Sequence, residues 1–300
     1  MRGRVTPSNP AKRTTLLGIL CGMGAALFWA AGFVVVRHGI NIGFSPADLT
    51  FHRCFWAGVL LFPLAWRDGL RDLNGVGWGR GILLTVLGGP GIAFVSYSGF
   101  LLVPLGHAGV IQPSCAALFG LVLATVVLLE RLPVRRAIGA MTIVLGLAVI
   151  GGEAIATIGV HGVAGDLMFV AAGAFFAAFA TLLRYWRVAP IRATVAVSVV
   201  SLAILPIYWA AVGFDRMASL GLWENLLQAV AQGLLAGPAA IYLFTRAVIL
   251  LGAGRGSVFS SLVPPGVLLI GWIALGEMPT ALQLTGLAIV LIGFRLTQRS

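Results

Sequence analysis

The sequence predicts an all-α integral membrane protein with ten transmembrane helices arranged as two inverted five-helix repeats. Three observations predict this fold class. The composition is 59% hydrophobic and only 10% charged, with a mean hydropathy of +1.02, whereas soluble globular proteins carry about 25% charged residues. The chain also divides into apolar stretches of spanning length, and its second half repeats the first. It is therefore expected to lie in a membrane, without a second, soluble domain.

The predicted spans are bounded by polar and turn-forming residues. Crossing about 30 Å of hydrocarbon takes about 20 residues of helix. Backbone groups in lipid must be satisfied within each segment, and no alternating pattern indicates a barrel, so the spans are predicted as helices. They are expected at 15–37, 47–66, 79–99, 106–128, 134–152, 165–185, 190–212, 225–246, 254–275 and 279–296.

The internal repeat is clearest between Leu27 and Arg37, a stretch that returns 147 positions later at 174–184. An offset of about half the chain indicates a duplication. The two five-helix repeats are expected at 1–152, which starts with a basic tail at 1–14, and at 153–300. The matches include Arg37 with Arg184, Glu130 with Glu277, Gly139 with Gly286, Gly146 with Gly293, and Gly89-Pro90 with Gly237-Pro238.

The basic residues predict the orientation of the helices, since Lys and Arg gather on the cytoplasmic side of a membrane. All but three of the 20 basic residues lie in the termini and in every second loop between spans. Both termini are therefore expected in the cytoplasm. The exceptions are Arg37, Arg53 and Arg216. Because each repeat has an odd number of spans, the second repeat enters the membrane from the opposite side, so the repeats are inverted.

Inverted repeats are typical of secondary transporters, whose substrate site lies near the midplane between the repeats and opens alternately to either side. Enzyme chemistry is not indicated, because the sequence has no HExxH, GxSxG, Walker A or dinucleotide-binding motif. No cofactor is expected. Cys21, Cys54 and Cys115 lie within apolar spans without metal-ligand spacing, so no metal site is expected either. The expected partners are a small-molecule substrate and lipid, and not nucleic acid, despite a net charge of +11.

Several motifs stand out along the chain: Leu27-Phe28-Trp29 with Arg37, the stretch from Pro46 to Arg53, Glu130-Arg131-Leu132-Pro133 and Gly276-Glu277-Met278-Pro279. They resemble those of the EamA-type family of the drug/metabolite transporter superfamily, over essentially the whole chain. The resemblance implies transport, often export, of small metabolites, and the family's bacterial amino-acid exporters are similar in length and span count. It implies export of amino acids, aromatic ones among them, or similar metabolites across a bacterial inner membrane.

Two alternatives remain open at this point. The first keeps the fold and changes the cargo to a drug, a cation or another metabolite; a cation carrier would need a buried carboxylate, which the spans lack. The second is a channel or a membrane scaffold that transports nothing.

The acidic residues bear on energy coupling. None of the nine lies in the middle of a predicted span, whereas proton-driven carriers generally place an ionisable residue within the membrane. Passive, facilitator-like transport is therefore favoured. Proton or ion exchange through His52 or His107 is the alternative. Glu130 and Glu277 are interpreted as helix-end residues at turns.

Arginines at membrane depth are costly, by roughly 2.5 to 3.5 kcal/mol at the bilayer centre, and are therefore informative. Arg53 lies about seven residues, or ~10 Å, inside the second span. Together with Arg37 it is expected to offer a guanidinium group to a substrate carboxylate. The alternative for Arg53 is a side chain that reaches back to the membrane surface.

Further candidates are aromatic and polar side chains deep in the spans, and the prolines that interrupt them. Aromatic rings at depth bind substrate or fill the core, and a buried tyrosine needs a hydrogen-bond partner. A proline kinks a helix, which suits a hinge or gate but also a rigid bend. Substrate contacts are expected at Trp29, Tyr97, Gln112, Ser114, Phe175, Phe176, Tyr242, Ser260 and Ser261, and hinge or gate positions at Pro90, Pro113, Pro238, Pro264 and Pro265.

Overall fold

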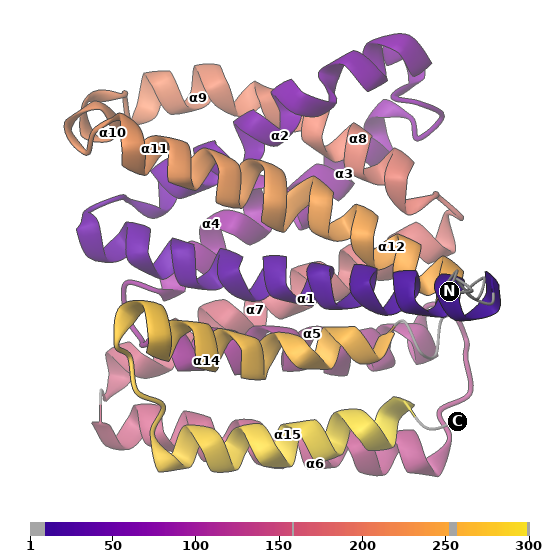
Figure 1. The fold of residues 1–300 in the computed structure, drawn as a ribbon, viewed down its shortest axis with the longest axis vertical. Coiled ribbons are helices and arrows are strands. Elements are labelled where there is room, and N and C mark those ends of the chain that lie inside the picture. Colours follow the sequence, from indigo (N-terminus) through magenta and orange to yellow (C-terminus); the bar gives the residue numbers. More distant parts are fainter. Residues whose placement is uncertain (1–9, 158, 252–256, 299–300) are drawn as a thin grey trace, which may run out of the picture.

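The computed structural model describes residues 10–157, 159–251 and 257–298, which form helices joined by turns, with no strand among them. The longer helices cross the molecule side by side (Figure 1). In chain order, the helices are α1 (Pro10–Ile42), α2 (Pro46–Asp68), η1 (Leu70–Asp72), α3 (Trp78–Gly88), α4 (Pro90–Gly99), α5 (Leu105–Val126), α6 (Val134–Thr157), α7 (Val160–Tyr185), α8 (Pro190–Val200), η2 (Ser201–Ala203), α9 (Ile204–Ala211), α10 (Asp215–Ser219), α11 (Leu222–Gln228), η3 (Ala229–Ala239), α12 (Ala240–Leu251), η4 (Ser257–Leu262), α14 (Val263–Leu275) and α15 (Ala281–Gln298).

The expected spans correspond to helical segments. Among the described residues, eight helices are long and apolar enough to cross a membrane, and two shorter apolar helices, Phe259–Leu275 and Ala281–Thr297, occupy the places of the ninth and tenth spans. The first residues of the expected ninth span, 254–256, lie outside the described residues. The protein is thus an all-helical membrane protein, and the count of ten spans stays a prediction.

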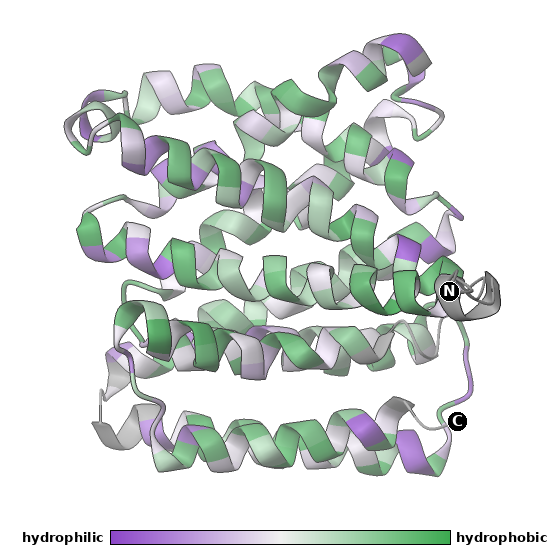
Figure 2. Cartoon of the chain, viewed as in Figure 1, coloured by the Kyte–Doolittle hydropathy of each residue, from purple (hydrophilic) through white to green (hydrophobic). Residues whose placement is uncertain are grey.

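Hydrophobic residues cover most of the length of these helices, and hydrophilic residues gather mainly near the two ends of the bundle (Figure 2). Large apolar side chains also face outward along the helices, such as Leu145 at 59% exposed and Ile273 at 75% exposed. An apolar exterior of this kind is stable in lipid and would be an aggregation surface in water. The outer surface therefore agrees with the membrane location that the composition predicts.

The start of α2 shows how a sequence motif becomes local structure. Ser45 precedes the helix, and its hydroxyl accepts a hydrogen bond from the backbone N–H of Asp48, while the Asp48 carboxylate accepts one from the backbone N–H of Ser45. This reciprocal capping box satisfies two backbone donors that a helix start leaves free. Pro46 occupies the first turn, where its missing N–H is harmless. The motif around Pro46 and Asp48 thus fixes where the helix that carries Arg53 begins.

The first helices of the two repeats cross the bundle in opposite directions. Arg37, near the end of α1, donates a hydrogen bond to the carbonyl of Phe100, just before α5 begins. Arg184, near the end of α7, forms an ion pair with Glu130, just after α5 ends. The two arginines therefore lie at opposite ends of α5, and these ends are called the Arg37 end and the Arg184 end below. In Figure 1, α1 begins and α15 finishes at the Arg184 end.

The helices of the two repeats are interleaved, and most of the packing joins one repeat to the other. α1 packs against α12 and α14, α5 against α7, α2 against α8, and α6 against α15. The pattern is nearly unchanged when the two repeats are exchanged, as a pseudo-two-fold axis requires. α6 runs on to Thr157, past the boundary expected after residue 152, and that boundary stays a prediction.

The repeated glycines lie where α6 meets α15. A Cβ atom on Gly139 would lie 2.8 Å from the carbonyl oxygen of Gly293, and a Cβ on Gly146 would lie 2.8 Å from that of Gly286. The reverse distances, from Gly293 and Gly286, are 2.8 and 2.9 Å. Small residues at these four places let the two backbones approach closely, as is typical of helix pairs in membranes.

Two of the expected hinge prolines lie at breaks in their helices. Pro90 follows Gly89, which separates α3 from α4, and Pro238 follows Gly237, whose backbone angles of φ −89° and ψ −106° are not helical. Pro264 and Pro265 lie in the first turn of α14, after the 3-10 segment η4. Pro113 lies inside α5, which continues through it. Motion at these positions stays a prediction.

Candidate functional site

A chain of polar interactions joins four helices inside the bundle. The hydroxyl of Tyr97 in α4 donates to the Gln232 side-chain oxygen at 3.0 Å, and the Gln232 amide nitrogen donates to the carbonyl of Gly32 in α1 at 2.8 Å. The guanidinium group of Arg53 in α2 interacts electrostatically with the Tyr97 side chain. Arg53, Tyr97, Gln232 and the Gly32 carbonyl are called the central polar network below.

The network is largely buried, yet it contains a full positive charge. Tyr97 is 5% exposed and Gln232 is 1% exposed, whereas Arg53 is partly exposed. Two other arginines that the sequence singles out, Arg37 and Arg184, lie beside the carboxylates of Glu277 and Glu130. No ion pair joins Arg53 to an acidic residue within those ranges. A guanidinium group without a counter-charge at this depth is costly unless a ligand supplies one.

Gln228 places a second amide one helical turn before Gln232. It is fully buried, and its nitrogen donates to the Val35 carbonyl at 3.0 Å. Its side-chain oxygen is buried without a hydrogen-bond donor among the described residues. η3, which starts directly after Gln228, is a π-helix, and π-helical turns are frequently found at functional sites. The two amides thus face α1 from a widened segment of helix.

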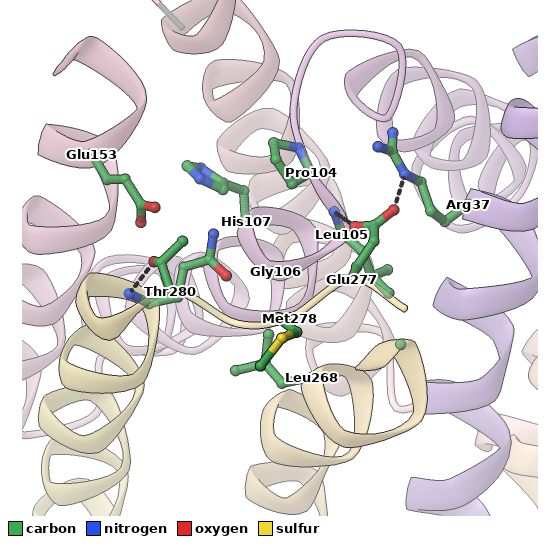
Figure 3. Close-up of a pocket in the computed structure, with 12 residues that line it drawn as sticks. Arg37, Pro104, Leu105, Gly106, His107, Glu153, Leu268, Glu277, Met278 and Thr280 are labelled. Carbon is green, nitrogen blue, oxygen red and sulfur yellow. Dashed lines mark hydrogen bonds and ion pairs between the residues drawn. The ribbon is translucent and has the colours of Figure 1, made fainter. Parts of the chain in front are cut away.

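A cavity of about 450 Å³ lies at the Arg37 end, between α1, α5, α6, α14 and α15. Its charged lining residues are Arg37, Glu153 and Glu277, and His107 also contributes to the wall (Figure 3). The volume is sufficient for several water molecules, each of which occupies about 30 Å³ in the liquid. This space is called the end cavity. Its lining is completed by Pro104, Leu105, Gly106, Leu268, Gly271, Met278, Thr280 and Gln283.

Arg37 is engaged at the wall of the end cavity and does not share the position of Arg53. Its Nε atom donates to Glu277 Oε1 at 2.6 Å, and a terminal nitrogen donates to the Phe100 carbonyl at 2.8 Å. Glu277 Oε2 also accepts from the backbone N–H of Leu105 at 3.1 Å. In this structure the Arg37 guanidinium is therefore paired with Glu277, and its expected contact with a substrate carboxylate stays a prediction.

The ion pairs at the two ends are related by the internal repeat. Arg37 corresponds to Arg184 and Glu277 to Glu130, and in each pair the arginine comes from one repeat and the glutamate from the other. The interpretation of both glutamates as helix-end residues is therefore incomplete, since each makes an ion pair between repeats. The Arg37–Glu277 pair is the more buried one, with side chains 20% and 25% exposed against 57% and 40% for Arg184 and Glu130.

The two histidines proposed for coupling have different environments. His107 in α5 is 1% exposed, and its Nδ1 lies 2.9 Å from Oδ1 of Asp166 in α7. His52 has both ring nitrogens engaged: Nδ1 accepts from the Trp56 indole, so Nε2 carries the proton that it donates to the Asn225 side-chain oxygen at 3.0 Å. His52 is thus held as a neutral residue between two helices.

The expected aromatic contacts separate into a packed group and an exposed group. Trp29 packs against Phe244 of α12, with ring centroids 5.3 Å apart, and Phe175 is partly buried. Phe176 is 47% exposed and Tyr242 is 55% exposed. The Tyr242 hydroxyl has no hydrogen-bond partner among the described residues, and its expected contact with substrate stays a prediction.

The expected polar contacts are also divided. Gln112 accepts a hydrogen bond from Ser96 at 2.6 Å, which joins α5 to α4. Ser114 is fully buried, and its hydroxyl has no partner within the described ranges. Ser260 is exposed, whereas Ser261 is partly buried and engaged in a contact. Only Gln112 and Ser114 therefore lie inside the bundle in the way expected of substrate contacts.

The sequence analysis missed Gln228, Gln232, Glu153 and Asp166. The glutamines are four residues apart, which puts them on one face of a helix in an otherwise apolar span, and this spacing could have identified them. Glu153 and Asp166 flank the loop between the fifth and sixth spans and were assigned to a loop and a span end. Both are buried, at 6% and 8% exposed, because the helices extend beyond the apolar stretches.

Comparison with known proteins identifies the family. The model of the EamA-like transporter family matches residues 16–152 and again residues 163–298. None of the curated proteins matches the sequence. A solved structure, titled only as a crystal structure of a protein, is 18% identical with a TM-score of 0.64. The match covers 95% of this chain and 96% of that one, so the likeness shows the fold alone. The two family matches span nearly the whole chain, and the protein belongs to the EamA-like transporter family of the drug/metabolite transporter superfamily.

Proposed function

We propose that this transporter exports amino acids, aromatic ones among them, or similar small carboxylate-bearing metabolites across the bacterial inner membrane by alternating access. Arg53 carries the proposal. Its guanidinium group lies within the bundle, contacts Tyr97 and has no acidic partner among the described residues. A substrate carboxylate supplies the missing negative charge and matches the two-pronged geometry of a guanidinium donor.

The glutamine face next to Arg53 supports an amino acid over a simple carboxylate. The side-chain oxygen of Gln228 is a buried acceptor without a donor among the residues that the structure describes, and a substrate ammonium group carries three donors. Gln228 precedes Gln232 by four residues, so the acceptor lies about one turn, ~6 Å, from the central polar network. A compact zwitterion has its two charges at a comparable separation.

An apolar wall next to the network supports a substrate with an aromatic or aliphatic side chain. Trp29 lies three residues before Gly32 on α1 and packs against Phe244, and both rings are partly exposed. Aromatic surfaces of this kind contribute large contact area with defined geometry. Trp29 is therefore proposed as the side-chain contact and Arg53 as the carboxylate contact.

The test is amino-acid counterflow in liposomes that contain the purified protein. Arg53→Ala is expected to lower the affinity for substrate by about 10- to 100-fold, because a hydrogen bond to a charged group contributes roughly 1.5 to 3 kcal/mol. Arg53→Lys is expected to restore part of the affinity, since it keeps the charge and loses the fork. Arg135→Ala is the matched control, because Arg135 is exposed at the start of α6.

The alternative functions give different results in the same assay. Unsaturable flux without counterflow would indicate a channel, and no flux with any amino acid, cationic drug or other metabolite would indicate a scaffold. Full activity of Arg53→Ala would leave only the interpretation in which its side chain reaches the membrane surface. Each of these outcomes contradicts the proposal.

The two ion pairs between repeats support alternating access. One pair closes the Arg37 end and the other closes the Arg184 end, and each joins helices of both repeats. Rocking of one repeat against the other would separate one pair while the other stays closed. We assign the Arg184 end to the cytoplasm, because most basic residues lie there, so substrate leaves at the Arg37 end. Labelling of a cysteine at either terminus only from the cytoplasmic side would agree with this orientation.

A further inference from the structure

An ionisable pair that substrate binding does not use lies at the wall of the end cavity, which His107 lines. His107 and Asp166 come from the first two turns of α5 and α7, and both residues are more than nine-tenths buried. Their contact of 2.9 Å uses Nδ1 of the imidazole and Oδ1 of the carboxylate. Oδ2 of Asp166 is buried without a hydrogen-bond partner among the described residues. A buried carboxylate with one oxygen unsatisfied is a costly arrangement that a structural ion pair would not require.

The position of the pair gives it access to protons from water. His107 lines the end cavity, and Figure 3 shows its ring directed to the side on which Glu153 lies. Nδ1 is committed to Asp166, so Nε2 is the atom that can accept a proton from the cavity. Arg37 and Glu277 form part of the cavity wall at the Arg37 end of the bundle.

The charges around the pair favour a positive ion over an anion. Within the described residues, α6 contributes Glu153, α7 contributes Asp166, and the segment between α14 and α15 contributes Glu277. Arg37 of α1 is the basic residue at the cavity, and it is paired with Glu277. A proton that binds to the His107–Asp166 pair therefore enters a region in which carboxylates outnumber cations.

We propose that the His107–Asp166 pair is a proton-binding site that couples export to proton entry, and this inference rests on the proposed function. A hydronium ion in the end cavity gives its proton to Nε2 of His107 and leaves water. The pair changes from a neutral imidazole beside a carboxylate to an imidazolium beside a carboxylate, so its net charge rises from −1 to 0. The proton returns to water when the site faces the Arg184 end.

A short connection links this site to the ion pair that closes the Arg37 end. Glu277 accepts the backbone N–H of Leu105, two residues before His107 in the first turn of α5. A change of charge at His107 therefore acts on the same helical turn that Glu277 holds. The sequence favours passive transport because no acidic residue lies in the middle of a predicted span. Asp166 and Glu153 lie near the ends of their helices and are buried, so that observation does not argue against a proton site at this end.

The experiment uses the full chain in liposomes, with the membrane potential clamped at zero. With a pH gradient of one unit, one-for-one exchange drives about tenfold accumulation of amino acid, because one pH unit is a tenfold ratio of protons. His107→Gln and Asp166→Asn are expected to keep counterflow at equal pH within about twofold and to lose the accumulation. His161→Gln is the matched control, because His161 is exposed on the same helix as Asp166, and it should accumulate substrate like the wild type.

The outcomes separate the two proposals. Counterflow by the wild type without accumulation in a pH gradient would overturn proton coupling and leave the proposed function intact. Absence of counterflow with every amino acid would overturn the proposed function and the coupling with it. Accumulation by both His107→Gln and Asp166→Asn would place the proton site elsewhere. If both variants fail to fold, as judged by gel filtration, the same gradient is applied to His107→Asn. The wild-type measurement alone still decides whether the protein uses protons.

Discussion

Gln232 connects two helices through one amide group. Its oxygen accepts the Tyr97 hydroxyl and its nitrogen donates to the Gly32 carbonyl, so both ends of the amide are satisfied in a site that is 1% exposed. Removing one partner leaves a buried polar atom unsatisfied, whereas removing both partners is milder. Because Gln232 is held by the Gly32 carbonyl and accepts the Tyr97 hydroxyl, it fixes the orientation of Tyr97 beside Arg53.

The contribution of the Tyr97–Gln232 hydrogen bond to stability can be measured with a double-mutant cycle. Tyr97→Phe and Gln232→Leu are each expected to lower the free energy of unfolding by about 1 to 3 kcal/mol. The double variant should lose less stability than the sum of the two single losses. With both side chains replaced, no partner of the Tyr97–Gln232 hydrogen bond remains buried and unpaired. Denaturant unfolding in detergent micelles gives the values, and Tyr185→Phe is the control, since Tyr185 is 60% exposed. Strict additivity would contradict the shared hydrogen bond.

Sequence reasoning identified the charged and aromatic members of the network and missed its amides. Arg53 and Tyr97 attract notice because a charge or a hydroxyl at membrane depth needs an explanation. Gln232 carries no charge, and its role depends on a contact across 135 residues with Tyr97. The ion pair of Arg37 could not be foreseen for a related reason. Its partner Glu277 is 240 residues away, and only the fold brings the two together.

At the scale of the helix, the contact between α6 and α15 depends on the absence of side chains at four glycines. Gly146→Ala would place a methyl group 2.8 Å from the Gly286 carbonyl oxygen and 3.0 Å from the Val290 backbone nitrogen. Backbone atoms cannot rotate away, so the helices must separate. The expected loss of stability is about 1 to 3 kcal/mol, as for other overpacked sites.

Gly151→Ala is the control on the same helix, because a Cβ there meets no described atom within 4 Å. Thermal unfolding of the detergent-solubilised protein compares the two variants, and only Gly146→Ala should unfold at a lower temperature. Equal stability of the two would mean that the α6–α15 contact is looser than the glycine distances indicate.

The elements themselves were largely predictable, and their partners were not. Apolar length predicted where the helices lie, and glycine-proline pairs predicted the breaks at Gly89 and Gly237. The internal repeat pairs Gly139 with Gly286 and Gly146 with Gly293. In the structure Gly139 instead faces Gly293, and Gly146 faces Gly286, which the repeat alone did not predict. Helical periodicity says little in a chain that is apolar on every face, so the faces that meet could not be read from it.

At the scale of the whole molecule, the two ion pairs between repeats differ in strength in a way that bears on the resting state. The Arg37–Glu277 pair also holds the Phe100 carbonyl and the Leu105 N–H. The Arg184–Glu130 pair is more exposed and lacks these additional contacts in the described residues. More contacts and less water favour closure at the Arg37 end, so the resting protein is expected to open more readily at the Arg184 end.

Removing one charge at each end should therefore shift the molecule in opposite directions. Glu277→Gln is expected to favour opening at the Arg37 end by roughly 10- to 100-fold, because hydrogen bonds to charged groups contribute about 1.5 to 3 kcal/mol. Hydrogen exchange in lipid nanodiscs should rise at 100–106 and fall at 127–133. Glu130→Gln should produce the reverse pattern with a smaller amplitude. Faster exchange at both ends in either variant would indicate general loosening instead of alternating access.

Exchanging the charges of each pair tests whether the pair is held by its own charges alone or also by hydrogen bonds to the backbone. Arg184→Glu or Glu130→Arg alone should open the Arg184 end, and the two together should restore exchange to the wild-type level, because the pair is held mainly by its own charges. The same exchange of Arg37 and Glu277 should fail to restore closure. A glutamate at position 37 would place its carboxylate, an acceptor, against the Phe100 carbonyl, another acceptor. An arginine at position 277 would place donors against the Leu105 N–H, another donor. Full rescue at the Arg37 end would show that its backbone contacts contribute little, and the expected preference of the resting state would be lost with them.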